Sequence, residues 1–305
     1  MRIILIGQAA FAQQVLDGLV ERAHDVAAVY CPPDTPGGKP DPLKTRALEI
    51  DVPVRQHRVL RGPDVAREFA DWQADLGVLA YVTQIVPATA FGAPRQGSIC
   101  FHPSLLPRYR GGSAIPWQII RGETRTGVTV FWVDPGIDTG PILLQKEAAI
   151  GPDDTAGSLY YNTLFKLGVD AVLEAVDLIA SGRAPRVVQD ESRASYDPLC
   201  RDEHAQVDWS CPVGEVYNQI RGCDPQPGAY VTRAGEKVRL YDARRTDVTD
   251  SRPGVVAAID ERGVVIGARG GAIALSRLRV GDRKVAARDG AQALGVEVGA
   301  PIGDA

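Results

Sequence analysis

Short apolar runs alternate with longer stretches of helical spacing through the first part of the chain. The runs of strand length are residues 3–7, 25–30, 52–54, 76–81, 98–101 and 127–133. The stretches whose apolar side chains recur at helical intervals are residues 11–21, 63–74 and 112–121. Strands that alternate with helices in this way predict an α/β fold built on a doubly wound, Rossmann-like parallel sheet.

A long helix and a change of pattern follow. Residues from about 155 to 180 keep helical spacing, with Thr155 suited to cap the start of the helix and Gly182 to end it. The later apolar runs are short and broken by turns, at residues 228–233, 237–243, 254–259, 263–267 and 273–280. We therefore expect a catalytic domain over residues 1–205 and a smaller, OB-like β-barrel domain over residues 206–305.

Two titratable side chains follow strands in loops rich in glycine and proline. One loop reads HPSLLPRYRGG and begins with His102, and the other reads DPGIDTG and contains Asp138. Because parallel strands end at the same edge of a sheet, we expect His102 and Asp138 to meet at its carboxyl edge. A histidine with a carboxylate partner has a fixed tautomer and works as a general acid or base.

Composition and charge narrow the class of protein. The 305 residues are 45% hydrophobic and 24% charged with a net charge of -4, which is ordinary for a globular chain. No apolar run reaches the roughly 18 residues of a membrane span, and Gln8 interrupts the first run before a signal peptide can form. The five cysteines include no C-x-x-C pair and the four histidines no H-x-x-H pair. We expect a cytoplasmic protein with reduced thiols, no metal and no membrane partner.

Binding of nucleotides or nucleic acids finds little support in the sequence. The first strand is followed by GQAAFA, which keeps one glycine where a phosphate-binding loop has several. Neither part of the chain is strongly basic, and Tyr230 and Tyr241 are too few aromatic residues for a base-stacking platform in the second domain. An RNA-binding module is therefore a weaker interpretation than an enzyme.

The two loops resemble those of a known family. The pattern H-P-S-L-L-P-x-x-R-G from His102, with the downstream D-x-G-x-D-T-G, resembles the formyltransferase family that uses 10-formyltetrahydrofolate. The segment IRGCDPQPGAY at residues 220–230 is similar to the start of that family's carboxyl-terminal barrel, so the resemblance covers essentially the whole chain. The segments KPDPL at residues 39–43 and LQKE at residues 144–147 are most similar to the hydrolase domain of 10-formyltetrahydrofolate dehydrogenase.

The resemblance implies roles for the residues at matching positions. His102 and Asp138 are expected to be the catalytic pair, and Cys100 stands at the oxyanion position, where the family has an asparagine. An amide there donates to the oxyanion of the tetrahedral intermediate, whereas a thiol is a weak donor. The residues expected to bind folate or substrate are Tyr81, Gln84, Ile85, Val86, Ser104, Leu105, Arg110, Asp134, Gly136, Thr139 and Gly140.

The formyl acceptor stays open at this stage. The hydrolase domain also lacks the asparagine, so Cys100 favours transfer from 10-formyltetrahydrofolate to water. The breadth of the family favours an amine acceptor, as in methionyl-tRNA formyltransferase or an amino-sugar N-formyltransferase. The non-enzyme alternative is a folate-binding protein that has lost turnover. Because the chain ends at Ala305, we expect none of the dehydrogenase's further domains and no NAD(P) chemistry.

Some of these residues also have a purely structural interpretation. Asp134 is typical of a turn residue, and Cys100 is typical of a small side chain beside a buried strand. Arg108 and Arg110 either meet acidic groups of a substrate or point into solvent.

Overall fold

The computed structural model describes residues 1–249 and 251–304, and backbone contacts divide the chain into two compact units. The first unit contains Met1–Gly112, Thr126–Ala148 and Asn162–Tyr196. The second unit contains Ser113–Arg125, Ala149–Tyr161 and Asp197–Ala305. Two internal segments thus group with the carboxyl-terminal part of the chain, and the boundary near residue 205 stays a proposal for where separable domains divide.

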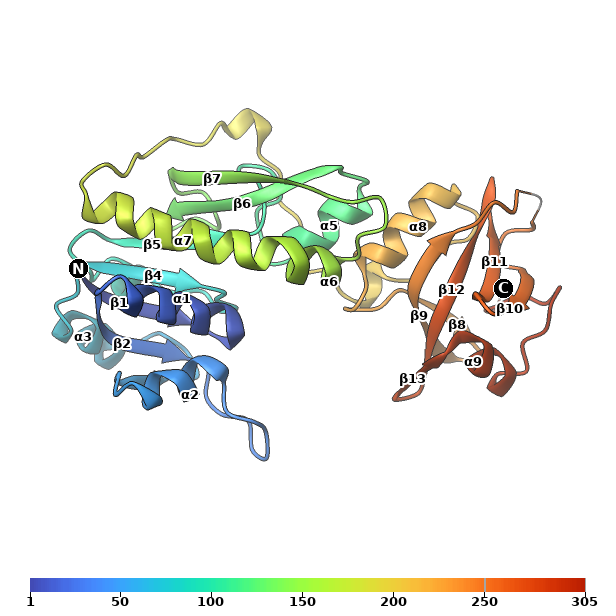
Figure 1. The fold of residues 1–305 in the computed structure, drawn as a ribbon, viewed down its shortest axis with the longest axis horizontal. Coiled ribbons are helices and arrows are strands. Elements are labelled where there is room, and N and C mark those ends of the chain that lie inside the picture. The colour runs from blue at the N-terminus through green and yellow to red at the C-terminus, as the bar shows by residue number, and fades with distance from the viewer. Residues whose placement is uncertain (250, 305) are drawn as a thin grey trace. The chain divides into compact units, whose positions relative to one another are not determined.

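A seven-stranded sheet forms the centre of the first unit (Figure 1). Its strands are β1 (Arg2–Gly7), β2 (Asp25–Cys31), β3 (Val54–Gln56), β4 (Leu76–Ala80), β5 (Ser98–His102), β6 (Arg125–Trp132) and β7 (Ile142–Ala149). Their order across the sheet is β3-β2-β1-β4-β5-β6-β7, and every pairing from β3 to β5 is parallel. The predicted Rossmann-like α/β architecture is confirmed for these five strands.

The sixth strand departs from the parallel arrangement. β6 pairs antiparallel with β5, so that Ile99 lies opposite Trp132 and His102 lies opposite Thr129. The prediction of a wholly parallel sheet is therefore wrong here, because the segment between β5 and β6 does not cross over the sheet. Its helix α5 (Ala114–Ile120) packs on α8 (Val213–Gly222) within the second unit instead.

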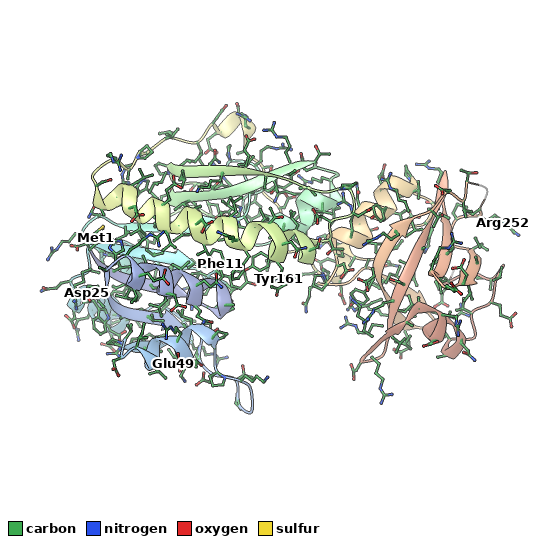
Figure 2. All side chains as sticks on the ribbon, viewed as in Figure 1. Met1, Phe11, Asp25, Glu49, Tyr161 and Arg252 are labelled. Atoms are coloured by element: carbon green, nitrogen blue, oxygen red, sulfur yellow. The ribbon has the colours of Figure 1, made fainter. Side chains whose placement is uncertain are left out.

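Helices cover both faces of the sheet in the first unit. They are α1 (Ala9–Glu21), α2 (Pro42–Glu49), α3 (Pro63–Asp71), α4 (Ala88–Phe91) and α7 (Phe165–Ala180). On one face, the ring of Phe11 on α1, labelled in Figure 2, lies 4.5 Å from that of Phe101 on β5. On the other face, Tyr30 stacks on Phe69 of α3, and Cys100 packs against the same cluster. Phe101 and Cys100 point to opposite faces because side chains alternate along a strand.

The expected long helix is present with one interruption. α6 (Ala156–Leu159) begins at Thr155, whose hydroxyl accepts from the Ser158 amide while the Ser158 hydroxyl accepts from the Thr155 amide. A single π turn (Tyr160–Leu164) then leads into α7, and Gly182 follows the helix with a φ of +69°. Thr155 and Gly182, the residues predicted from the sequence, therefore stand at the start and just after the end of the helix.

An antiparallel sheet forms the second unit. Its strands are β8 (Tyr230–Arg233), β9 (Glu236–Arg245), β10 (Val256–Asp260), β11 (Gly263–Ala268), β12 (Gly271–Val280) and β13 (Arg283–Ala286), with helix α9 (Ala287–Ala293) after them. The order is β10-β11-β12-β9-β8, and β13 pairs with β12. Between the described residues, no pairing joins β8 to β10, so the predicted β domain is confirmed but closure into an OB-like barrel is not.

Candidate active site

His102 lies at the end of β5 with a partner at each ring nitrogen. Its side chain is 7% exposed, and Nε2 lies 2.7 Å from the Tyr109 carbonyl oxygen. Because a carbonyl oxygen only accepts, the ring must donate from Nε2. Nδ1 lies 3.5 Å from Oδ2 of Asp138, which is longer than a direct hydrogen bond. Tyr109 thus fixes the tautomer and leaves Nδ1 to work with Asp138.

Asp138 reaches this position through an unusual backbone conformation. Its φ is 56°, in the left-handed region that an aspartate tolerates better than most residues. Oδ2 also accepts a hydrogen bond of 2.8 Å from the Gly111 amide. His102 and Asp138 are brought together as expected, but by another route: since β6 is antiparallel to β5, the loop turns back across β5.

Cys100 lies two residues before His102 and therefore on the same face of β5. Its Sγ donates a weak 3.5 Å hydrogen bond to the Phe101 carbonyl oxygen. Burial, with a smaller contribution from the Asp138 carboxylate, raises the pKa of the thiol. At neutral pH the side chain is a protonated thiol beside the pair, which argues against a nucleophilic role.

The loop after His102 is held by the buried hydroxyl groups of Thr129 and Ser104 and by the side-chain amide of Gln145 on β7. Thr129 of β6 donates to the Ser104 carbonyl oxygen at 2.6 Å and accepts from the Leu106 amide at 3.1 Å. The Gln145 amide donates to Thr129 Oγ1 and to the Leu106 carbonyl oxygen, both at 2.9 Å. Ser104 is fully buried and its hydroxyl donates to the Arg108 carbonyl oxygen, so it shapes the loop from within.

The loop that carries Asp138 is organised by Asp134. Oδ1 of Asp134 accepts from the Gly136 amide at 3.0 Å and from the Thr139 hydroxyl at 2.7 Å. A Cβ at Gly136 would lie 1.9 Å from Thr139 Oγ1, and one at Gly140 would lie 1.7 Å from the Trp132 carbonyl oxygen. The contacts of Asp134 are those of a turn residue. Gly140 is required because the Trp132 backbone approaches it closely, and Gly136 leaves room for the Thr139 side chain.

The remaining residues of the expected folate site follow β4 and β5. Tyr81, at the end of β4, has a φ of 61° and is 42% exposed, and Ile85 is 68% exposed. A small pocket at the carboxyl ends of β1, β2 and β4 is lined by Gly7, Cys31, Tyr81 and Gln84 among others. Val86 is buried in the cluster that supports this edge, and Leu105 lies against Gly127. The pocket lies at the strand ends where doubly wound folds bind ligands.

Comparisons with known proteins identify the family of the chain. The model described as formyl transferase matches residues 1–176, and the model described as formyl transferase, C-terminal domain, matches residues 200–293. The chain belongs to the formyl transferase family. The methionyl-tRNA formyltransferase of Geobacter sulfurreducens is 37% identical to this formyl transferase over 289 residues, which cover 93% of this chain and 90% of that protein.

Other relatives share part of their length with it. The cytosolic 10-formyltetrahydrofolate dehydrogenase of Homo sapiens is 41% identical over 248 residues, which cover 80% of this formyl transferase and 27% of the dehydrogenase. The chain therefore spans about a quarter of the length of that relative. The crystal structure of HypX from Aquifex aeolicus in complex with tetrahydrofolic acid has a TM-score of 0.72 at 23% identity, covering 98% of this chain and 48% of that chain. The last match shows a shared fold.

The Arg110 side chain is engaged by other residues of the chain. It is 7% exposed, and its guanidinium donates to Gln189 and to both carboxylate oxygens of Glu191. The hydrogen bond from Arg110 lowers the pKa of Glu191. These contacts give Arg110 a structural place in the site instead of the substrate contact we expected.

Several residues near the pair carry no motif that sequence reasoning could use. Tyr109 acts through its backbone carbonyl, Thr129 through a hydroxyl inside a strand, and Gln189 from a polar, aperiodic segment. None of these contacts follows from residue spacing alone. Within residues 1–249 and 251–304, no cluster of histidine, cysteine and carboxylate side chains is placed to hold a metal ion. In the same part of the chain, no helix has the length and apolar character of a membrane span.

Proposed function

We propose that this formyl transferase cleaves the formyl group from 10-formyltetrahydrofolate and passes it to water, giving tetrahydrofolate and formate. The observation that carries the proposal is the buried His102–Asp138 pair, held by Tyr109 and flanked by the thiol of Cys100. Similarity to a relative named as a 10-formyltetrahydrofolate dehydrogenase supports this formyl donor. The thiol of Cys100 in place of an amide donor supports water as the acceptor, because the hydrolase domain that the sequence motifs resemble also lacks the asparagine.

The geometry suggests how the pair divides the work. Oδ2 of Asp138 accepts from the Gly111 amide and is also the oxygen that lies 3.5 Å from Nδ1 of His102. Among the described residues, Oδ1 has no hydrogen-bond partner. We place the attacking water within hydrogen-bond reach of both Asp138 and Nδ1 of His102, to the side of the 3.5 Å line that joins Oδ2 and Nδ1. Asp138 and His102 take the proton of the water as it attacks the formyl carbon.

Collapse of the intermediate completes the reaction. The protonated ring of His102 steadies the oxyanion and then protonates N10 of the folate as the bond from carbon to N10 breaks. One proton of the water thus reaches N10 through His102, and the other stays on the product as formic acid and is released to solvent when formic acid ionises to formate. The Tyr109 carbonyl holds the opposite side of the ring throughout, which keeps Nδ1 aimed at the reacting groups.

The folate is proposed to lie along two backbone segments. A pterin ring carries many donors and acceptors, which suits the peptide groups of residues 81–86 and 134–140. Tyr81 and Ile85 present exposed apolar surface at the end of β4, against which a ring can pack. Thr139 and Asp134 keep the second segment in shape through their hydrogen bond.

A carboxylate at the start of α1 bears on the choice of acceptor. Both carboxylate oxygens of Asp41 accept from the Ala9 amide, at 3.0 and 2.9 Å, and one of them also caps α2 through the Leu43 amide. The start of the first helix is where doubly wound folds commonly bind phosphate. The Asp41 carboxylate occupies the Ala9 amide and repels a second anion, which favours an acceptor without a phosphate at this point.

Transfer to methionyl-tRNA is the second candidate. It is favoured by the 37% identity to a methionyl-tRNA formyltransferase over 93% of this chain. The two candidates differ in what the protein does without an amine, because hydrolysis needs only water and the folate.

The test is incubation of the purified protein with 10-formyltetrahydrofolate alone, following tetrahydrofolate by absorbance and formate by a coupled assay. We expect formate release without an acceptor, nearly complete loss of turnover in His102→Ala, and tetrahydrofolate binding retained by that variant. Formylation only after methionyl-tRNA is added would favour the second candidate. A protein inert under both conditions, or a His102→Ala variant with the wild-type rate, would contradict the assignment.

A further inference from the structure

Gln189 joins the two loops that carry the active site. Its side chain is 5% exposed, and Nε2 donates to the carbonyl oxygens of Asp138 at 2.8 Å and Gly140 at 2.7 Å. Its Oε1 accepts from Arg110, from Nε at 3.2 Å and from Nη2 at 2.8 Å. A flipped amide would set its NH2 group against a guanidinium and its oxygen against two carbonyls, so the contacts fix the orientation.

Arg110 links this amide back to the carboxylate of Asp138. Its guanidinium is held on the other side by Glu191, at 2.6 Å from Nη2 to Oε1 and 2.9 Å from Nη1 to Oε2. The next residue, Gly111, donates its amide to Oδ2 of Asp138 at 2.8 Å. Asp138 is therefore held at two points: its backbone carbonyl accepts from Gln189, and its carboxylate accepts from the Gly111 amide.

The backbone conformation of Asp138 explains why it needs these hydrogen bonds. A φ of 56° is less costly for aspartate than for most residues with a side chain, but it is still strained and needs support from its surroundings. The two hydrogen bonds from Gln189 go to the carbonyl oxygens of Asp138 and Gly140, which flank Thr139 in the chain. They hold the part of the loop that sets the direction of the Asp138 side chain.

We propose that Gln189, supported by Arg110 and Glu191, is a positioning residue that fixes Asp138 opposite Nδ1 of His102. The inference rests on the proposed function, since it concerns the same catalytic pair. Gln189 acts through Asp138 and does not contact the reacting groups, so its removal should slow turnover without weakening the binding of the folate. A misplacement of about 1 Å is enough to cost on the order of 100-fold in rate.

Three variants separate the possible roles of the amide. Gln189→Leu removes both of its functions, whereas Gln189→Glu keeps an acceptor for Arg110 but loses the donation to the two carbonyls. We expect kcat to fall about 10- to 100-fold in both, with KM for 10-formyltetrahydrofolate within about threefold of the wild type. Glu191→Ala changes a side chain that is 68% exposed, so it folds, and it loosens Arg110 with a smaller loss of kcat.

The decisive measurement is a double-mutant cycle with Asp138→Asn. If Gln189 acts through Asp138, then Gln189→Leu adds little to the loss already caused by Asp138→Asn. The matched control is Gln118→Leu, because Gln118 is also buried, donates to the Ala114 carbonyl oxygen and lies in the second unit. We expect this control to keep the wild-type kcat, and thermal unfolding of every variant reports on folding.

The outcomes distinguish this inference from the proposed function. A wild type that releases no formate overturns the proposed function and this inference with it. An active wild type whose kcat survives Gln189→Leu and Glu191→Ala overturns the inference alone. Losses from Gln189→Leu and Asp138→Asn that multiply also overturn it, because they show that Gln189 acts independently of Asp138.

Discussion

Asp138→Asn separates the charge of the carboxylate that we propose to be catalytic from its geometry. The asparagine keeps a side-chain oxygen that accepts from the Gly111 amide, so the 2.8 Å contact that anchors the side chain can persist. What disappears is the negative charge 3.5 Å from Nδ1 of His102. Replacement by alanine would remove both and leave the two effects mixed.

The size of the effect follows from that distance. Two unit charges 3.5 Å apart attract with about 5 kcal/mol at an effective dielectric constant of about 20. At about 1.4 kcal/mol for each tenfold change, this corresponds to about three powers of ten in rate when the imidazolium forms in the transition state. The Asp138 side chain is 18% exposed, so solvent screens part of the attraction. We expect kcat to fall about 100- to 1,000-fold.

Formate release from 10-formyltetrahydrofolate under saturating substrate measures this loss directly. The KM of the variant should change little, since Asp138 is proposed to act on the attacking water and not on the folate. Thermal unfolding should show that the loop tolerates the asparagine. A variant that keeps kcat within about threefold of the wild type would refute the role of the Asp138 charge, whatever Gln189 contributes.

Two further changes test other parts of the molecule. Cys100→Ala should keep turnover within about threefold of the wild type, because the raised pKa of the Cys100 thiol leaves it protonated. Initial rates of formate release check this. A loss above about 100-fold would indicate that the sulfur takes part in the reaction. Burial raises the pKa of Asp224, although the Asp242 amide donates to its carboxylate. The folded state therefore binds the proton more tightly than the unfolded state, and stability falls as pH rises from the ordinary aspartate pKa through the raised one. Denaturant unfolding should show wild type losing stability relative to Asp224→Asn across that window, and an equal pH dependence in both proteins would contradict the burial argument.

Much of the first unit was predictable because local periodicity and topology agree there. The alternation of apolar strands with amphipathic stretches predicts β1 to β5 together with α1 and α3, and burial of both sheet faces enforces the same order. The short helices α2 and α4 were not predicted. The direction of β6 was not predictable in this way. Periodicity identifies a strand but carries no information on its direction, and the helix before β6 packs on α8, far along the sequence.

The candidate site shows the same division between local and long-range information. His102 and Asp138 stand in loops whose glycines and prolines make them visible, and their partnership could be guessed from the positions of those loops. The residues that hold them could not. Tyr109 contributes a carbonyl, which every residue has, and Gln189 lies 51 positions from Asp138 in a segment without regular structure. Only the folded chain reveals that such groups converge.

The way the site is held bears on what it can catalyse. The ring of His102 is fixed by the Tyr109 carbonyl, and Asp138 is fixed by Gln189 and Gly111, so neither side chain needs to reorganise when charge develops between them. Cys100 adds no strong donor beside them, because its thiol is directed at the Phe101 carbonyl oxygen. The proposed acid–base pair is therefore well ordered, and in the proposed mechanism support for an oxyanion falls mainly to the protonated ring of His102. A small nucleophile that His102 and Asp138 can deprotonate together meets the requirements of such a site, and water meets them with the fewest additional contacts.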